Sequence, residues 1–206
     1  MRIIGITGPT GAGKSLLRAY AEEQKLPCID ADGLYHSMLE PPSRCLDAIR
    51  KTFGDGLFAP DGTLDRAKLS QLVFSSPKNL ELLNSTVLEM VLDEMRHIIA
   101  NYESSGEDTV VIDAPTLIES GFHKECDVVI SVIAPADIRL ERIKKRDSLS
   151  DERAALRVNA QQSNDFYTNA STHVLINDKD ADKLRREAEK LFEKLNIGRR
   201  KVTNAT

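Results

Sequence analysis

The feature that most constrains the fold is an eight-residue segment near the N-terminus, GPTGAGKS, which runs from Gly8 to Ser15. It matches the phosphate-binding loop G-x-x-x-x-G-K-[ST] at every required position. The apolar run RIIGIT before it predicts a short buried strand, and SLLRAYAEE after it predicts an amphipathic helix. The alternative is a glycine-rich turn that binds nothing, but the flanking strand and helix favour a phosphate site.

The chemistry of bound phosphate explains the residue types in this loop. Glycines let backbone N–H groups turn toward phosphate oxygens without a side chain in the way. The helix that begins near Lys14 adds its positive N-terminal end. Lys14 can reach the β- and γ-phosphates of a nucleotide, and the Ser15 hydroxyl can ligate Mg²⁺.

Bulk composition narrows the class of protein. The 206 residues suit one α/β unit with an insertion, and 41% hydrophobic with 29% charged residues is typical of a globular protein. A net charge of -4 gives no electrostatic footprint for nucleic acid, so we expect no nucleic-acid partner. Cys28, Cys45 and Cys126 lack C-x-x-C spacing, which indicates reduced thiols and a cytoplasmic protein. No apolar stretch approaches the roughly 18 residues of a membrane span, so we expect no membrane partner.

Strand and helix patterns alternate along the chain. Short, β-branched, continuously apolar runs typical of parallel strands buried on both faces follow the first one at 26–30, 109–115, 127–135 and 173–177. Apolar residues recur at helical spacing over 80–99 and again from Leu184 to Leu195. This alternation predicts an α/β fold, a doubly wound five-stranded parallel sheet with helices on both faces.

Residues 54–104 break the alternation of strands and helices, because helices follow a Gly/Pro/Asp-rich connection with no strand until 109. We interpret this region as a helical insertion that shapes a substrate pocket, since ligands of α/β sheets bind beyond the carboxyl ends of strands. The alternative is that these helices only complete the core. The predicted organisation is a single kinase-like unit: its core covers about 1–53, 105–137 and 166–206, and a lid covers about 138–165.

Three aspartates follow predicted strands. Asp30 and Asp32 lie after the second strand, where a carboxylate could accept the proton of an attacking hydroxyl. Either could instead cap the next helix; for Asp30 the two interpretations stay open, and for Asp32 we favour function. Asp113 ends the apolar run VVID and could help to hold Mg²⁺, although strands often end in aspartate for turn chemistry.

The segment RLERIKKR places Arg139, Arg142 and Arg146 three and four residues apart, so they share a helix face. Such a run is usually a solvated surface. In a phosphate-loop kinase, cations on a mobile lid can close over the polyphosphate and neutralise charge in the transition state. A helix over about 150–163 would form the other arm of that lid.

Together these motifs resemble the dephospho-CoA kinase family of the P-loop nucleotide-kinase superfamily. The resemblance covers nearly the whole chain and rests on the phosphate loop, DAD after the second strand, FGDG followed by DGTLDRAKLSQLVF, and the segments LLN, DAPTLIE, RLERIKKRD and RVNAQ. The DAD segment together with DG-x-LDR-x-x-L-x-x-x-VF is its most specific part. The family's fold is a phosphate-loop core with a helical CoA-binding domain and a lid.

The resemblance implies ATP-dependent, Mg²⁺-assisted phosphorylation of the ribose 3′-hydroxyl of dephospho-CoA, which gives CoA and ADP. It implies catalytic roles for Asp32, Lys14, Arg142 and Arg146. ATP-binding positions would be Thr10, Gly11, Ala12, Gly13, Lys14, Ser15 and Asn177. Asp30, Asp32 and Asp113 would bind the acceptor, and Ser15 with Asp113 would serve the metal.

This chain departs from the family's pattern mainly on the acceptor side and in the lid. Leu88 and Glu89 stand where the family has His-Pro, Thr116 interrupts the usual Pro-Leu-Leu, and Arg139 replaces a Gln. Another nucleotide or small-molecule kinase is therefore one alternative function. A non-catalytic nucleotide switch is the other. A GTP-binding switch is disfavoured because Asp178 follows Asn177 where N-K-x-D needs a lysine.

Overall fold

The computed structural model describes residues 1–197, with Phe74 described in its backbone alone. Its contacts divide the chain into two compact units. The sheet unit comprises residues 1–29 and the chain from 102 onward, and the helical unit comprises residues 30–101. The predicted core range 166–206 therefore extends beyond the described residues. Within residues 1–197, no helix combines the length and the apolar character needed to cross a membrane.

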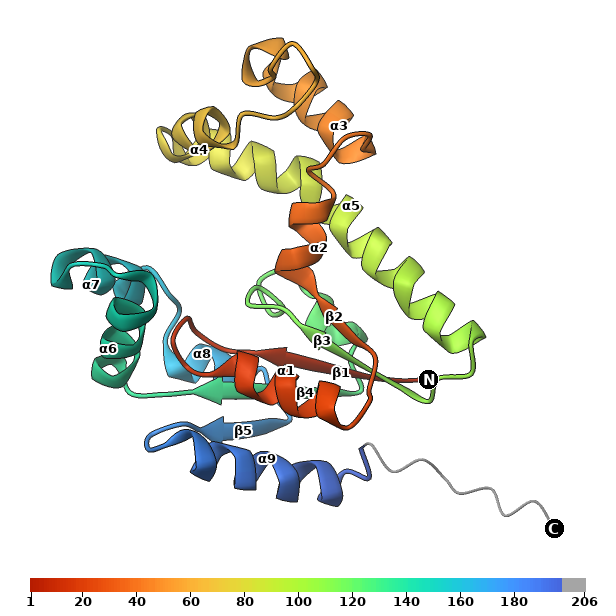
Figure 1. Cartoon of the computed structure of the whole chain (residues 1–206), viewed down its shortest axis with the longest axis vertical. Helices are drawn as coiled ribbons and strands as arrows, with labels where there is room; N and C mark the ends of the chain where they lie inside the picture. The colour runs from red at the N-terminus through yellow and green to blue at the C-terminus, as the bar shows by residue number, and fades with distance from the viewer. Residues whose placement is uncertain (198–206) are drawn as a thin grey trace. The chain divides into compact units, whose positions relative to one another are not determined.

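A five-stranded sheet in the order β2-β3-β1-β4-β5 forms the centre of the sheet unit (Figure 1). Its strands are β1 (Arg2–Thr7), β2 (Cys28–Asp30), β3 (Thr109–Asp113), β4 (Val128–Ile133) and β5 (His173–Ile176). The pairs β1–β3, β1–β4 and β4–β5 are parallel, which confirms the predicted α/β class and strand number. The observed strands are up to three residues shorter than the predicted ones.

Helices cover both faces of this sheet. On one face, α1 (Lys14–Glu23) and α9 (Ala181–Lys194) contact each other, and their apolar residues form one core with alternate residues of β1 and β4. Tyr20 of α1 meets Phe192 of α9 edge to face, with ring centroids 5.2 Å apart. Ser131 of β4, which points to the opposite face from its neighbours, donates to the Tyr167 carbonyl of α8 (Asn164–Asn169). The sheet is therefore doubly wound, as predicted.

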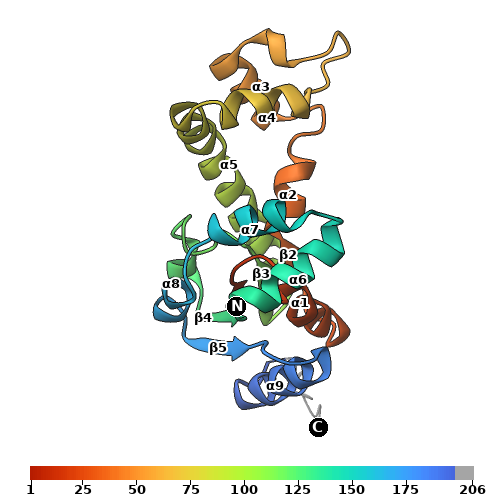
Figure 2. The same cartoon turned by 90° about the vertical axis from the view of Figure 1, so that its left-hand side faces the viewer.

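Beyond β4, α6 (Ala136–Asp147) and α7 (Asp151–Asn159) form a helical hairpin (Figure 2). Ile143, Ala154 and Val158 make a small core between the two helices. Ser150 caps α7 by accepting from the Arg153 amide at 3.4 Å. The predicted second arm at 150–163 therefore begins where expected but ends at Asn159. The sheet unit also contains the short helix η2 (Phe122–Glu125).

The helical unit has its own apolar core. It contains α2 (Ala31–Ser37), α3 (Arg44–Phe53), η1 (Asp55–Leu57), α4 (Arg66–Phe74) and most of α5 (Pro77–Ser104). Buried residues of α3 pack in the same cluster as Leu83 and Val87 of α5. This shared core explains why the helical unit begins at Asp30, whereas the predicted insertion begins at 54. Residues 31–53 therefore belong to the helical unit, and our assignment of them to the sheet core was wrong.

Helix α5 is 28 residues long and runs without a break through Leu88 and Glu89. Proline inside a helix lacks the N–H donor and clashes with the preceding turn. Glu89 keeps that donor, which is compatible with an uninterrupted helix.

Candidate active site

The predicted phosphate loop connects β1 to α1 and lies tightly against β4. Gly8 has φ +135°, and a Cβ atom there would come within 2.0 Å of the Val132 carbonyl oxygen. Gly13 has φ +108° and is the residue that precedes the first turn of α1. Both positions require glycine, because a side chain would meet a neighbouring atom and an unfavourable backbone conformation.

The start of α1 provides the positive end of a helix at this loop. No side chain among residues 1–197 caps the helix at Gly13. The Lys14 ammonium donates to the carbonyl oxygens of Gly8 at 2.7 Å and Pro9 at 3.3 Å, so it lies along the loop. Backbone amides at a helix N-terminus beside a fixed ammonium group are suited to bind an anion such as a phosphate chain.

Asn177, which follows β5, contacts the phosphate loop through its side chain. It is 5% exposed, and its Nδ2 donates to the Ala12 carbonyl oxygen at 2.7 Å. A Cβ atom at Gly13 would lie 2.4 Å from the same nitrogen, so the carboxamide packs directly on the glycine. The structure therefore brings together two of the positions assigned to ATP, although 165 residues separate them.

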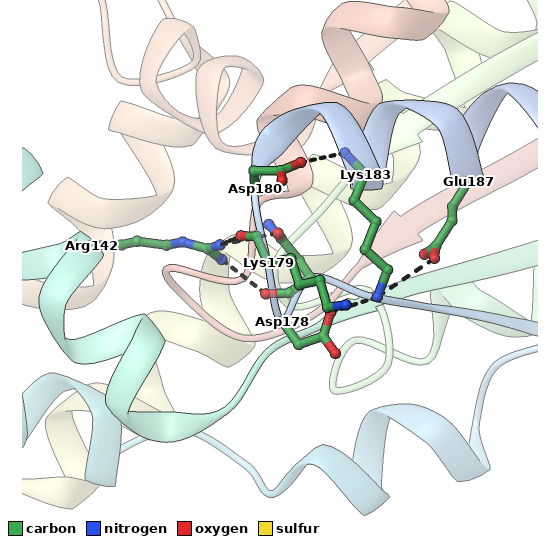
Figure 3. Close-up of polar contacts among 7 residues, drawn as sticks. Arg142, Asp178, Lys179, Asp180, Lys183 and Glu187 are labelled. Atoms are coloured by element: carbon green, nitrogen blue, oxygen red, sulfur yellow. Dashed lines mark hydrogen bonds and ion pairs between the residues drawn. The ribbon is translucent and has the colours of Figure 1, made fainter.

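Arg142 of α6 connects the phosphate loop to the segment between β5 and α9; Figure 3 shows its contacts with that segment. Its Nη1 donates to the carbonyl oxygens of Gly11 at 3.4 Å and Asn177 at 3.3 Å. Its Nη2 donates to the Asn177 side-chain oxygen at 3.0 Å and to the Lys179 carbonyl at 3.1 Å. This guanidinium thus serves four acceptors, one in the phosphate loop and three in the segment 177–179.

The other two arginines of α6 have different surroundings. Arg139 is 6% exposed, and its Nε and Nη1 have no hydrogen-bond partner among residues 1–197. Burial lowers the pKa of this guanidinium, and Tyr167 nearby opposes the shift. Arg146 is largely exposed and forms a two-bond contact with Asp147, whose pKa it holds below the ordinary value. The three arginines that we expected on one face of this helix therefore differ in burial and in hydrogen-bond partners.

Gln161 also contacts the phosphate loop, although it was not among the predicted site residues. It lies after α7, and its Oε1 accepts from the Thr10 amide of the phosphate loop at 3.2 Å. The segment RVNAQ contains this residue, so the family resemblance held a signal for it. The chain after the second hairpin helix therefore reaches the phosphate loop directly.

Asp113 ends β3 beside the strand that leads into the phosphate loop, in register with Ile6. Its carboxylate is mostly buried and lies 3.6 Å from Nη1 of Arg18 on α1. Ser15 lies in the first turn of the same helix. A hydroxyl and a carboxylate are hard oxygen donors, which suit Mg²⁺ when phosphates and waters supply its remaining ligands.

Asp30 and Asp32 belong to the helical unit and differ in their contacts. Asp30 is the N-cap of α2, and its Oδ1 accepts from the Gly33 amide at 3.1 Å. Asp32 lies in the first turn of the same helix and is exposed. The Asp30 contact is that of a helix cap, and the catalytic role of Asp32 remains a prediction.

Comparisons with known proteins point to one family. A family model described as dephospho-CoA kinase matches residues 2–183. A dephospho-CoA kinase of Anaeromyxobacter dehalogenans is 34% identical over 206 residues, which cover 100% of this chain and 98% of the relative. One from Symbiobacterium thermophilum is 34% identical over 189 residues, covering 92% and 79% of the two chains.

A similar solved structure, of TT1252 from Thermus thermophilus, has a TM-score of 0.79 at 29% identity and covers 94% of this chain and 97% of that one. The match to the family model extends from β1 through the phosphate loop and the α6–α7 hairpin into α9. With two relatives above 30% identity over most of their length, this chain belongs to the dephospho-CoA kinase family.

Proposed function

We propose that this protein transfers the γ-phosphoryl group of ATP to the ribose 3′-hydroxyl of dephospho-CoA, giving CoA and ADP. The observation that carries the proposal is the intact phosphate loop in a chain of this family. The Lys14 ammonium binds the Gly8 carbonyl of this loop, and α1 begins directly after Gly13. We infer that the reaction takes place in the cytoplasm, since Cys28, Cys45 and Cys126 are free thiols, as is usual in a reducing compartment.

In the proposed reaction, the acceptor oxygen forms a bond to the γ-phosphorus while the bond from that phosphorus to the β,γ-bridging oxygen breaks. Lys14 and the loop amides of residues 10–15 hold the negative charge of the phosphate chain. Asp32 accepts the proton of the acceptor hydroxyl and later releases it to water. Arg146 on the α6–α7 hairpin, which we propose as the lid, adds positive charge near the transferring group.

Ser15 and Asp113 would hold Mg²⁺ with the nucleotide's phosphates, and the bound ion would neutralise phosphate charge. The Arg18–Asp113 ion pair would keep the carboxylate oriented toward the loop. In the helical unit, Asp32 begins the surface that we propose for dephospho-CoA. Asp30 contributes by fixing the first turn of α2, on which Asp32 lies.

A coupled assay of ADP release tests the proposal directly. The purified protein should release ADP from MgATP only when dephospho-CoA is present, and mass spectrometry should identify CoA as the product. AMP and shikimate serve as competing acceptors, because other kinases share the fold. Equal ADP release with any acceptor, or with none, would contradict the assignment of dephospho-CoA.

A further inference from the structure

Two carbonyl groups of the phosphate loop accept hydrogen bonds from side chains far away in the sequence. The Ala12 carbonyl accepts from Asn177 at 2.7 Å, and the Gly11 carbonyl accepts from Arg142 at 3.4 Å. We propose that Asn177 and Arg142 are positioning residues, which hold the loop in the conformation that receives the phosphate chain. This inference rests on the proposed use of ATP by the loop.

The position of Asn177 is fixed by the sheet. Its backbone amide donates to the Ile133 carbonyl at 2.8 Å, which continues the pairing of β4 with β5 by one residue. The side chain is almost fully buried and packs on Gly13. The pairing of β5 with β4 therefore holds the Asn177 carboxamide in place against the Ala12 carbonyl of the loop.

Arg142 determines which way this amide faces. Because Nη2 of Arg142 donates to Oδ1 of Asn177, the oxygen must point to the arginine and the NH₂ group must point to Ala12. The same guanidinium binds the Asn177 and Lys179 carbonyls, so it also holds the backbone of this segment. The planar fork of arginine suits several acceptors at once, whereas lysine offers only a point charge.

The contact between Asn177 and the Ala12 carbonyl also fixes the direction of the Gly13 amide, because both groups belong to one peptide bond. In a trans peptide the C=O and the following N–H point in opposite directions. When Asn177 holds the Ala12 carbonyl, the Gly13 amide therefore points away from Asn177, to the side where the motif's amides bind phosphate. Losing the contact would leave a buried carbonyl without its partner and free the peptide to rotate.

The residues that follow offer a matched control. Asp180 caps α9 by accepting from the Lys183 amide at 2.7 Å, and the Lys183 ammonium pairs with Asp178 at 2.7 Å and Glu187 at 3.7 Å (Figure 3). These contacts remain within residues 178–187. Lys183→Met thus perturbs the same segment of the chain without removing a bond to the phosphate loop.

Calorimetric titration with inorganic tripolyphosphate isolates the predicted effect, because this probe carries the phosphates and no base. We expect Asn177→Ala to weaken both tripolyphosphate and ATP about tenfold, as for the loss of one buried hydrogen bond. Lys183→Met should bind both as wild type does. If Asn177→Ala weakened ATP but not tripolyphosphate, the residue would contact only the base, and the inference would be overturned.

Arg142→Lys provides a second test that keeps the charge. We expect it to weaken tripolyphosphate about as much as Asn177→Ala does, and the double variant to lose little more, because the two residues act as one unit. Additive losses, or wild-type affinity in Arg142→Lys, would contradict the inference. If the wild-type protein bound ATP but not tripolyphosphate, the loop would not hold the phosphate chain by itself and the inference would be overturned. Failure of the wild-type protein to bind ATP would instead refute the proposed function.

Discussion

The two aspartates at the start of α2 allow a paired test of catalysis, because they are neighbours on the same turn and we propose different roles for them. Asp30 is the N-cap of α2 and accepts from the Gly33 amide, and Asp32 follows in the first turn; both residues are exposed. The perturbation is Asp32→Asn, with Asp30→Asn as its matched control. Both substitutions preserve size and remove one negative charge.

The expected magnitudes separate the two positions. Asparagine caps a helix about as well as aspartate, so Asp30→Asn should change little. Asp32→Asn removes a charge near a helix N-terminus, which costs about 0.3–1 kcal/mol of stability at an exposed position. General-base assistance contributes about 10²–10⁴-fold, equivalent to roughly 3–5 kcal/mol of activation free energy. If Asp32 is the general base, the loss of activation free energy in Asp32→Asn is therefore larger than the loss of stability.

The assay is steady-state ADP release with saturating dephospho-CoA, accompanied by thermal melting of each variant. We expect Asp32→Asn to lose about 10²–10⁴-fold in kcat, with ATP affinity and melting temperature nearly unchanged. Asp30→Asn should retain most of its activity, and Asp30→Ala should lose about 1 kcal/mol of stability with its cap. Near wild-type kcat in Asp32→Asn would refute the assignment of the base.

Four further predictions concern the sheet unit. Lys14→Ala should nearly abolish turnover and leave the circular dichroism spectrum intact; a folded variant with normal kcat would contradict the phosphate-loop assignment. Arg146→Ala should lower kcat about tenfold or more in steady-state kinetics, and should affect dephospho-CoA binding less; unchanged kcat would make this arginine a surface residue. Gly13→Ala should lower the free energy of unfolding by about 2–5 kcal/mol in urea denaturation, since strain at φ +108° adds to displacement of Asn177; wild-type stability would argue against the packing. Burial raises the pKa of Cys126 to about 12, so its thiol stays protonated in the folded state after it ionises in the unfolded chain. The free energy of unfolding should therefore be unaffected by this group below about pH 9 and fall as the pH rises toward 12, with a shallower fall in Cys126→Ala in urea titrations; equal slopes would show that the thiol does not contribute.

Local sequence patterns were sufficient to predict much of this fold. The phosphate loop has a fixed spacing because glycines, a lysine and a hydroxyl must occupy set positions around a phosphate chain. The strands at β1, β3 and β4 are short and continuously apolar, since parallel strands are covered on both faces. These patterns depend on neighbours along the chain, so they predict the strands and the loop without any knowledge of the tertiary contacts.

Contacts between segments that are far apart in the sequence could not be predicted from residue spacing and are known only from the tertiary structure. Residues 31–53 belong to the helical unit because α3 shares a core with α5, a contact between segments that are far apart in the sequence. Asn177 reaches Ala12 across 165 residues, and Arg142 holds both, only because β5 and α6 lie beside the phosphate loop. The three arginines of α6 have different surroundings because each packs against different neighbours. Arg139 is buried, Arg142 binds the phosphate loop, and Arg146 is exposed.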